Sequence, residues 1–296
     1  MQWKEICEPW VGSPATQERL LGGLINDVYR VSGPLGSLIL KSAPAFIASA
    51  PEIPLSPRRL AVENAALKIA QEFDTRSVQV PNVLHFDESA SVLLTEDLGV
   101  GPTLRKSDNL MADLNDLAAW LKRLHQSTQH LPELPDFGVH AVRKTNQYVP
   151  LSEQIKYSNG AFSEELIWVA DYFSTRPSCL IMGDLWMPSV LKRKNLFIID
   201  WEFSAHGHPE QDVAHLAAHL FLSYGSALES HFLNAYQIGD WNEVQCRAFR
   251  AHRGAELLQR TIGAFPGTGG ASAKSPAQMR AVAERWLVSA GQGNEV

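Results

Sequence analysis

Two short segments decide the fold of this chain: MGDLWMPSV at residues 182–190 and LFIIDWE at residues 196–202. Each contains a brief apolar run, typical of a short strand, that leads into acidic residues. Asp184 comes at the end of the first run, Ser189 follows it five residues later, and Asp200 ends the second run. Carboxylate and hydroxyl oxygens are ligands that a hard cation such as Mg²⁺ prefers. The two segments therefore predict an aspartate base beside a magnesium site.

This spacing is the one by which kinases place a base next to a metal. In phosphoryl transfer, an aspartate orients and deprotonates the attacking hydroxyl, and further ligands hold Mg²⁺ on the phosphates. The pattern predicts Asp184 as the catalytic aspartate and predicts the metal ligands Asp200, Glu202 and Ser189. The alternative is that these acids are solvated loop residues. That is the ordinary interpretation of one acid, but three acids at these spacings do not favour it.

The same residues resemble the aminoglycoside phosphotransferase and choline kinase superfamily, whose loops read approximately His-Gly-Asp-x-x-x-x-Asn and Ile-Asp-Trp/Pro-Glu. Within it, the closest resemblance is to 5-methylthioribose kinase, which has Gly-Asp-Leu-x-x-x-Ser and Asp-x-Glu. Two positions depart from the commoner pattern, because Met182 replaces His and Ser189 replaces Asn. The resemblance implies an α+β, two-lobed protein-kinase-like fold, ATP and Mg²⁺ as cofactors, and a small-molecule alcohol as the acceptor.

Residues 1–98 predict a small N-terminal nucleotide-binding lobe with an antiparallel sheet and one helix. Short apolar runs alternate there with turns, which is typical of consecutive hairpins. The predicted strands are residues 20–23, 27–32, 37–41, 80–86 and 91–95. Residues 58–72 have apolar positions at helical spacing and predict the helix. The proline-rich residues 42–57 predict a long loop.

Residues 99–296 predict a larger, mostly helical C-terminal lobe that carries catalysis and substrate binding. Its amphipathic stretches are long enough to be packed helices. The predicted helices are residues 109–129, 163–172, 211–224, 241–262 and 278–289. The change from a strand-rich to a helix-rich pattern predicts that the lobes join near residues 96–99.

Upstream residues match the parts of this fold that hold a nucleotide. The resemblance implies that Lys41, at a strand end, contacts the α- and β-phosphates and that Glu63 pairs with it from the next helix. Gly22, Gly23 and Asn26 lie in a turn one strand pair earlier, where glycines let backbone N–H groups approach phosphate oxygens. An ordinary hairpin turn has the same appearance, and the order Lys, Glu, Asp, Asp is what favours the nucleotide interpretation.

Residues 93–99, LLTEDLG, resemble the hinge between the lobes. In the superfamily, backbone groups of the hinge usually bind the adenine, so the resemblance implies contacts at Glu96 and Leu98. Residues 121–125, LKRLH, resemble the end of the first large-lobe helix, where the histidine, here His125, is structural. Asp212 matches an aspartate at a helix start that braces the catalytic loop, a position where free N–H groups favour a carboxylate.

The sequence leaves several alternatives for the alcohol that accepts the phosphoryl group. Near their C-terminal end the 5-methylthioribose kinases have paired arginines that contact the substrate side, and residues 259–263, QRTIG, keep one of them, Arg260. Choline, ethanolamine, hydroxytryptamine-like amines, homoserine and aminoglycosides remain alternatives to methylthioribose. His215 and His219 lie one helical turn apart, but zinc hydrolases of that spacing carry a Glu after the first His, where this chain has Leu216. These histidines are therefore expected to lie on one face of a helix, with one or two of them lining the acceptor pocket.

The composition excludes several classes of partner. The formal net charge of −6 argues against nucleic acid and against an anionic membrane surface. Three widely spaced cysteines, Cys7, Cys179 and Cys246, indicate neither a disulfide framework nor a zinc knuckle and fit a reducing compartment. Charged residues in the first ten positions leave no signal-peptide core, so the chain is expected to be cytoplasmic. The oligomeric state is open, a homodimer included.

Two other functions compete with an active small-molecule kinase. The departures at Met182 and Ser189 raise the alternative of a catalytically inactive ATP-binding protein of the same fold with a scaffold or regulatory role. An inactive kinase usually loses the lysine or an aspartate, and Lys41, Asp184 and Asp200 are all present. A protein kinase is disfavoured because no Ala-Pro-Glu follows Asp200 and no long activation segment precedes Asp212.

Overall fold

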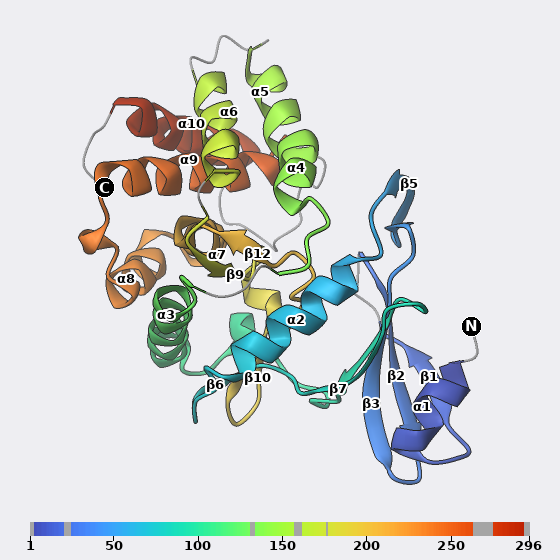
Figure 1. Cartoon of the computed structure of the whole chain (residues 1–296). Coiled ribbons are helices and arrows are strands. Elements are labelled where there is room, and N and C mark those ends of the chain that lie inside the picture. Colours follow the sequence, from blue (N-terminus) through green and yellow to red (C-terminus); the bar gives the residue numbers. More distant parts are fainter. Residues whose placement is uncertain are drawn as a thin grey trace.

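A computed structural model describes residues 3–20, 25–130, 134–156, 162–175, 177–262 and 275–292. It has the expected α+β, two-lobed kinase-like fold, with an antiparallel sheet at the N-terminal end and helices in the C-terminal part (Figure 1). We propose residues 1–98 and 99–296 as the two lobes.

The small lobe is built on a five-stranded antiparallel sheet of order β1-β2-β3-β8-β7. Its strands are β1 (Thr16–Arg19), β2 (Asp27–Gly33), β3 (Gly36–Ser42), β7 (Val83–Asp87) and β8 (Val92–Glu96). Because side chains alternate between faces along a strand, Val92 and Leu94 pack in one core while Leu93 packs in another on the opposite face. Strand β1 ends at Arg19, and residues 21–23 of the first expected strand lie outside the described residues.

The expectation of one small-lobe helix was wrong, because two helices cover the sheet. Helix α1 (Trp3–Val11) buries Cys7 and Val11 on the face of Leu38 and Leu40. These apolar positions are at helical spacing, but the helix is short and contains Pro9, so the pattern is weak. Helix α2 (Arg59–Gln71) lies on the other side, between the sheet and the large lobe (Figure 1).

The proline-rich segment also differs from its predicted loop. Strands β4 (Phe46–Ile47) and β5 (Ala50–Pro54) form a short antiparallel hairpin there. The buried Arg59 holds this segment in place, since its guanidinium donates to the carbonyls of Leu55, Ser56 and Phe46. These bonds satisfy backbone groups that the prolines leave without ladder partners.

The large lobe is a group of helices packed around two cores, one of which continues into the small lobe (Figure 1). The helices are α3 (Leu110–Ser127), α4 (Val139–Arg143), α5 (Val149–Lys156), α6 (Ser163–Phe173), α7 (Pro209–Tyr224), α8 (Ser226–Tyr236), α9 (Glu243–Gln259) and α10 (Pro276–Gln292). A single π-helical stretch, Lys144–Tyr148, joins α4 to α5. Helix α7 is central and buried nearly all round, because it packs against both α8 and α9.

Short strands carry the two acidic segments, residues 182–190 and 196–202. Strand β9 (Cys179–Ile181) pairs with β12 (Ala205–Gly207), and β10 (Val190–Lys192) forms a hairpin with β11 (Leu196–Ile198). Strand β6 (Val78–Gln79), from the N-terminal part, adds to this hairpin in parallel, with Val78 opposite Leu196. The loops after β9 and β11 therefore lie side by side at the junction of the lobes.

Candidate active site

Lys41 is the centre of a buried charge cluster. Its Nζ lies 2.6 Å from Glu63 Oε1, 2.8 Å from Asp200 Oδ1 and 3.9 Å from Glu202 Oε2. Strand β3, helix α2 and the loop after β11 thus converge on one ammonium group. Burial alone lowers the pKa of Lys41, but the three carboxylates raise it well above its usual value, so the ammonium stays charged.

Glu202 is tied to the small lobe by a second contact. Asn26 Nδ2 donates to Glu202 Oε2 at 2.7 Å, and Arg59 Nε donates to Asn26 Oδ1 at 2.7 Å. Burial raises the pKa of Glu202 to about 8, although Lys41 opposes this shift. Sequence reasoning missed Arg59, because an arginine at a helix start usually lies in solvent.

The same cluster has the donor set of a magnesium site. Carboxylate oxygens of Glu63, Asp200 and Glu202 lie within 4.8 Å of one another. The Asp200 side chain is 45% exposed, whereas those of Glu63 and Glu202 are buried, so the cluster opens on one side. Asp200 also has a left-handed backbone, φ 67°, which is uncommon for a residue with a side chain and frequent at functional sites. Hard oxygen ligands and excess negative charge fit Mg²⁺.

The loop that carries Asp184 is braced from below by Asp212. The backbone N–H groups of Met182 and Gly183 each donate to an Asp212 oxygen at 2.8 Å. His125 Nε2 lies 3.1 Å from the same carboxylate, and His125 Nδ1 lies 2.8 Å from the Tyr236 hydroxyl. Position 183 requires glycine, because φ is +84° and a Cβ would lie 2.1 Å from the carbonyl oxygen of Phe203. This close approach holds the Asp184 loop against the loop of Asp200.

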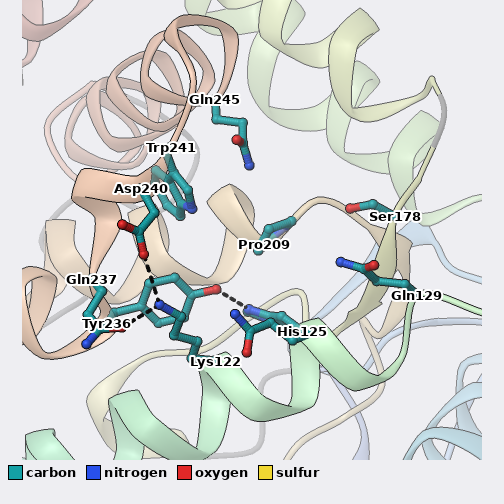
Figure 2. Close-up of a pocket in the computed structure, with 11 residues that line it drawn as sticks. Lys122, His125, Gln129, Ser178, Pro209, Tyr236, Gln237, Asp240, Trp241 and Gln245 are labelled. Carbon is teal, nitrogen blue, oxygen red and sulfur yellow. Dashed lines mark hydrogen bonds and ion pairs between the residues drawn. The ribbon is translucent and has the colours of Figure 1, made fainter.

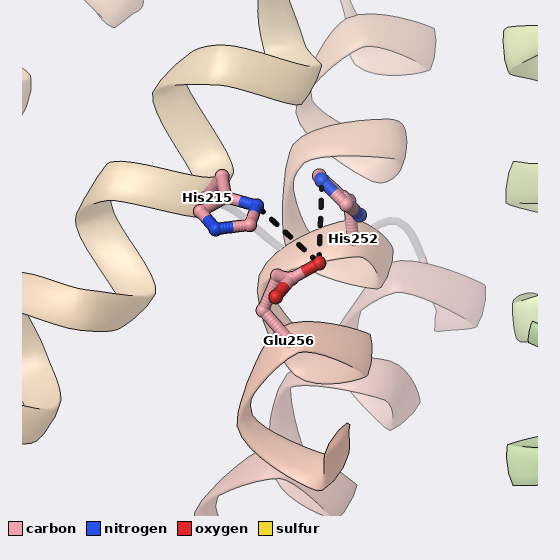
Figure 3. Close-up of side chains that lie close together, drawn as sticks. All are labelled: His215, His252 and Glu256. Atoms are coloured by element: carbon pink, nitrogen blue, oxygen red, sulfur yellow. Dashed lines mark ion pairs between the residues drawn. The ribbon is translucent and has the colours of Figure 1, made fainter. Parts of the chain in front are cut away.

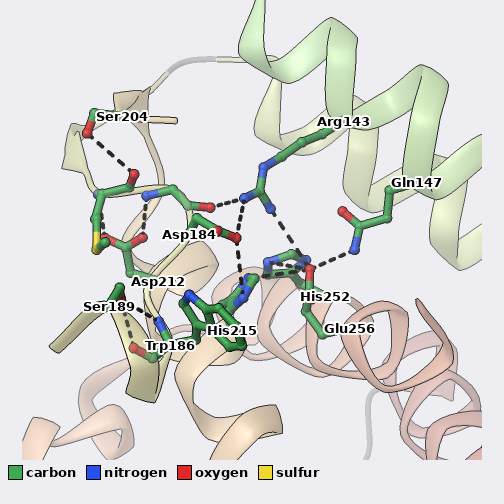
Figure 4. A network of polar contacts seen from close by, with 12 residues as sticks. Arg143, Gln147, Asp184, Trp186, Ser189, Ser204, Asp212, His215, His252 and Glu256 are labelled. Atoms are coloured by element: carbon green, nitrogen blue, oxygen red, sulfur yellow. Dashed lines mark hydrogen bonds and ion pairs between the residues drawn. The ribbon is translucent and has the colours of Figure 1, made fainter. Parts of the chain in front are cut away.

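Asp184 faces a group of cationic and imidazole side chains (Figure 4). Arg143 lies 3.7 Å from Asp184 Oδ1 and also donates to the carbonyl of Gly183. His215 Nε2 lies 3.5 Å from the same oxygen. Neither residue has a local motif, and His215 was predicted only as one of several helix-face histidines. Its position on α7, one turn after Asp212, is the signal that places it near the catalytic loop.

Ser189 lies in a tight turn rather than in the open part of the cluster. Its hydroxyl donates to the carbonyl of Trp186 at 2.8 Å and accepts from the Trp186 N–H at 3.2 Å. The residue is fully buried, and its own carbonyl accepts from the N–H of Ile199 at 2.8 Å. Ser189 therefore joins the Asp184 loop to the end of β11, and a metal would have to use its remaining lone pair.

The remaining predicted nucleotide contacts are Gly22, Gly23, Glu96 and Leu98. Gly22 and Gly23 lie outside the described residues. The Glu96 carboxylate accepts from both the N–H and the amide group of Asn82. The Leu98 carbonyl accepts from Arg193 Nε at 2.7 Å, so this hinge carbonyl already has one partner.

Arg260 lies near the loop that carries Asp184 and Trp186. Its guanidinium is 3.3 Å from His219 Nε2 and 5.9 Å from the centre of the Trp186 ring. The His215 and His219 rings stack at 5.0 Å. The helical turn that separates these histidines thus places them on one face, beside Trp186 and Arg260.

A cavity of about 170 Å³ lies elsewhere, between α3 and the residues that join α8 to α9 (Figure 2). Its lining includes His125 and Tyr236, which connect through Asp212 to the catalytic loop. No proposed catalytic side chain is among its described lining residues. It is therefore separate from the acceptor side of Asp184.

The comparison with protein families decides the class. A family profile described as "Phosphotransferase enzyme family" matches residues 16–249, which include Lys41, Glu63, Asp184 and Asp200 but not Glu256 or Arg260. The chain belongs to this family. The expected superfamily and the expected enzyme class, a phosphotransferase with an alcohol group as acceptor, are thereby confirmed.

Curated relatives of this phosphotransferase include two fungal enzymes. A 4-hydroxytryptamine kinase of Psilocybe cyanescens is 23% identical over 294 residues, covering 84% of this chain and 81% of the relative. The choline kinase LicA of Streptococcus pneumoniae has the same fold, with a TM-score of 0.62 and 20% identity over 97% of this chain and 98% of that one. A spectinomycin phosphotransferase solved with ADP and its antibiotic has a TM-score of 0.56 and 11% identity over 98% of each chain.

The comparisons leave part of the expectation untested. The closer resemblance to 5-methylthioribose kinase stays a prediction. Among the described helices, none combines the length and the apolar character that a membrane crossing needs.

Proposed function

We propose that this phosphotransferase moves the γ-phosphoryl group of ATP to a hydroxyl group of a small molecule, with Asp184 as the base. The observation that carries the proposal is the convergence of Glu63 and Asp200 on Lys41, at 2.6 and 2.8 Å, beside the braced loop of Asp184. In kinases, such a lysine contacts the phosphates and the helix glutamate holds it in place. Asp184 orients the acceptor hydroxyl and receives its proton.

The proposed metal is Mg²⁺, with Asp200 and Glu202 as its principal ligands. The motif implies Ser189 as a further ligand, but its hydroxyl makes both of its hydrogen bonds with Trp186. Bound there, Mg²⁺ neutralises negative charge on the phosphates. Asn26 holds Glu202 at the edge of the cluster. The turn of Gly22 and Gly23 is the proposed cover of the phosphates, and backbone groups of Glu96 and Leu98 are the proposed adenine contacts.

The charges near Asp184 favour an uncharged alcohol, such as a sugar, as the acceptor. Both carboxylates on this side, Asp184 and Glu256, are faced by Arg143, at 3.7 and 3.9 Å. Arg260 adds a second guanidinium near Trp186. An ammonium group would meet two cations there. Among the described residues of this site, each carboxylate already has a cationic neighbour. A sugar related to methylthioribose fits this surface, and Arg260 is proposed to contact it.

A hydroxylated aromatic amine is the second candidate acceptor. Two 4-hydroxytryptamine kinases are relatives, and Trp186 offers an indole ring beside the acceptor side. Aromatic rings stack well on such a surface.

An ATP-consumption screen with purified protein tests these proposals. The acceptors are methylthioribose, other pentoses, 4-hydroxytryptamine, choline and an aminoglycoside, each with Mg²⁺. We expect the highest kcat/KM with a sugar, and a preference for 4-hydroxytryptamine would favour the second candidate. ATP binding without turnover on any acceptor would favour the inactive ATP-binding alternative.

A further inference from the structure

Three buried side chains on two helices, His215, His252 and Glu256, lie close together (Figure 3). His215 is on α7, and His252 and Glu256 are one turn apart on α9. Glu256 Oε1 lies 3.4 Å from His215 Nδ1 and 3.9 Å from His252 Nε2. At 2% exposed, Glu256 is closed off from solvent. A buried carboxylate needs close partners, so its surroundings indicate its role.

Two histidines and a carboxylate are also the donor set of a zinc site. The neighbours of Glu256 argue against this interpretation. Gln147 Nε2 already donates to Glu256 Oε1 at 2.6 Å, and guanidinium groups of Arg143 and Arg260 lie 3.9 Å from the carboxylate. A dication placed beside two guanidinium groups would be repelled. The protein itself therefore balances the charge of Glu256.

The ionisation of Glu256 agrees with this balance. Burial alone raises the pKa of Glu256, but His215, His252 and Arg260 lower it well below its usual range. The carboxylate is thus negative across the physiological pH range and can hold cationic groups in place.

Two neighbours of Glu256 also contact Asp184 (Figure 4). Arg143 reaches Asp184 Oδ1 at 3.7 Å and Glu256 Oε1 at 3.9 Å. His215 faces the same two oxygens, with Nε2 at 3.5 Å from Asp184 and Nδ1 at 3.4 Å from Glu256. Neither ring nitrogen of His215 has a closer hydrogen-bond partner in the described part of the chain. Asp184 and Glu256 are therefore joined by two parallel bridges.

We propose that Glu256 is a positioning residue for phosphoryl transfer, which holds Arg143 and His215 in the orientation that contacts Asp184. The inference rests on the proposed role of Asp184 as the base. Asp184 is on a loop with a 37% exposed side chain, and Arg143 is the last residue of a helix of only five residues, so neither is rigid by itself. Glu256, in the middle of a packed helix, provides the fixed point. Misplacement of a catalytic group by about 1 Å can cost on the order of 100-fold in rate.

The test replaces Glu256 by an isosteric amide. We expect Glu256→Gln to lower kcat by roughly 10- to 100-fold and to leave the KM for ATP within about twofold, because the nucleotide site is untouched. The control is Glu229→Gln, which breaks another buried ion pair, Glu229 of α8 with Arg253 of α9 at 2.7 Å. It should cost similar stability and leave kcat unchanged. ADP release from MgATP is measured with the best acceptor of the screen and with water.

A double variant with Arg143 separates positioning from a structural role. If Glu256 acts by holding Arg143 against Asp184, the losses of kcat in Glu256→Gln and in Arg143→Lys do not multiply in the double variant. Independent losses that multiply would overturn the proposal, as would a Glu256→Gln enzyme with the kcat of the parent. If Asp184→Asn is itself as active as the parent, the proposed function fails instead.

A second variant covers the case in which Glu256→Gln does not fold. Arg143→Lys keeps the charge, but one ammonium cannot span the two carboxylates as a guanidinium does. A fall in kcat with an unchanged melting temperature supports the bridge, and an unchanged kcat overturns it. Stoichiometric Zn²⁺ binding that raises turnover in excess Mg²⁺, and that is lost in His252→Gln, would show a metal site and also overturn the proposal.

Discussion

Asp184 and Asp200 are both aspartates at strand ends, but their neighbours differ. Asp184 is faced by Arg143 and His215 on the acceptor side, whereas Asp200 contacts Lys41 at 2.8 Å within a group of carboxylates. These surroundings fit the proposed roles, Asp184 as the base and Asp200 as a ligand of Mg²⁺. Substitutions at the two positions should have separable effects.

We expect Asp184→Asn to abolish phosphoryl transfer and to leave the affinity for ATP within a few-fold. A base acts mainly on the transition state, and Asn keeps the size of the side chain. ADP release and ATP titration by calorimetry measure the two quantities. Turnover equal to that of the parent would remove Asp184 from catalysis.

Asp200→Ala should remove the Mg²⁺ dependence of nucleotide binding, because the proposed cation loses its principal exposed carboxylate. ATP is titrated with and without Mg²⁺ in the parent and the variant. Asp171→Ala, which removes an exposed carboxylate that pairs with Lys144, is the control. A variant whose ATP affinity still rises with Mg²⁺ as in the parent would place the metal elsewhere.

The motif implies that Ser189 is a ligand of the metal, and a substitution can test this role. Its hydroxyl makes both of its hydrogen bonds with Trp186, so we expect Ser189→Ala to lower the melting temperature and to leave the Mg²⁺ requirement within about twofold. A Mg²⁺ series of ADP release for Ser189→Ala and Ser189→Asn measures this. A tenfold higher requirement in the alanine variant, restored by asparagine, would establish the ligand role.

Local motifs predict some contacts of the site and miss others for a physical reason. Lys41, Glu63 and Asp200 were expected together because each has a fixed place in a short motif, and the structure brings them within 2.8 Å. Arg143 and Glu256 have no such motif. The contacts of Arg143 with Asp184 and with Glu256 depend on how α4 and α9 are placed in the folded chain, which spacing along the sequence does not determine.

At the scale of elements, α7 organises the large lobe. Asp212 in its first turn braces the catalytic loop, and His215 one turn later faces Asp184. Pro209 begins the helix at a position that suits proline. Glu210, next to it, is fully buried. Its Oε1 accepts from Gln245, while Oε2 has no hydrogen-bond partner within the described ranges.

Glu210 predicts a pH dependence of stability. Burial raises its pKa to about 7 from 4.5, so the folded protein holds the proton more tightly than the unfolded chain. The contribution of Glu210 to the free energy of unfolding is therefore greatest below pH 4.5. It falls as the pH rises toward 7, by on the order of 3 kcal/mol at most. Glu210→Gln should raise the melting temperature at pH 8 and change little at pH 4.5. Glu243→Gln, at an exposed position of α9, is the control, and equal shifts at both pH values would contradict the assignment.

The long helices were predictable from apolar spacing, since α3, α6, α7, α9 and α10 occupy the expected segments within a few residues. The short elements were not. Helix α4, the π-helical stretch and α5 follow one another around Pro150, and their form depends on tertiary contacts such as that of Tyr148 with His252 at 2.8 Å. Short segments contain too few periodic positions to outweigh such contacts.

At the scale of the whole molecule, Arg193 fastens the joint between the lobes. Its guanidinium donates to the carbonyls of Leu98, Gly99 and Pro102, at 2.7 to 3.1 Å, and also to that of Lys192. Nothing in the local sequence predicts this contact, because Arg193 lies in a two-stranded hairpin turn that reads as solvated.

We expect Arg193→Ala to lower the stability by roughly 1–3 kcal/mol and to raise the KM for ATP several-fold, since the hinge loses its fixed conformation. Chemical denaturation and ADP release measure the two effects. The adjacent exposed Lys194→Ala is the control and should be neutral. An Arg193→Ala enzyme with the KM of the parent would separate the hinge contact from nucleotide binding.

The pairing of β6 with β11 has a consequence for synthesis on the ribosome. Val78 lies opposite Leu196, so the last part of the small lobe is completed by a strand made more than a hundred residues later. The Lys41 cluster likewise waits for Asp200. Since such distant contacts form late, the emerging N-terminal part carries Lys41 and Glu63 for some time without their third partner. We therefore expect residues 1–98 expressed alone to be unstable to proteolysis, and the nucleotide site to form only after most of the large lobe has emerged.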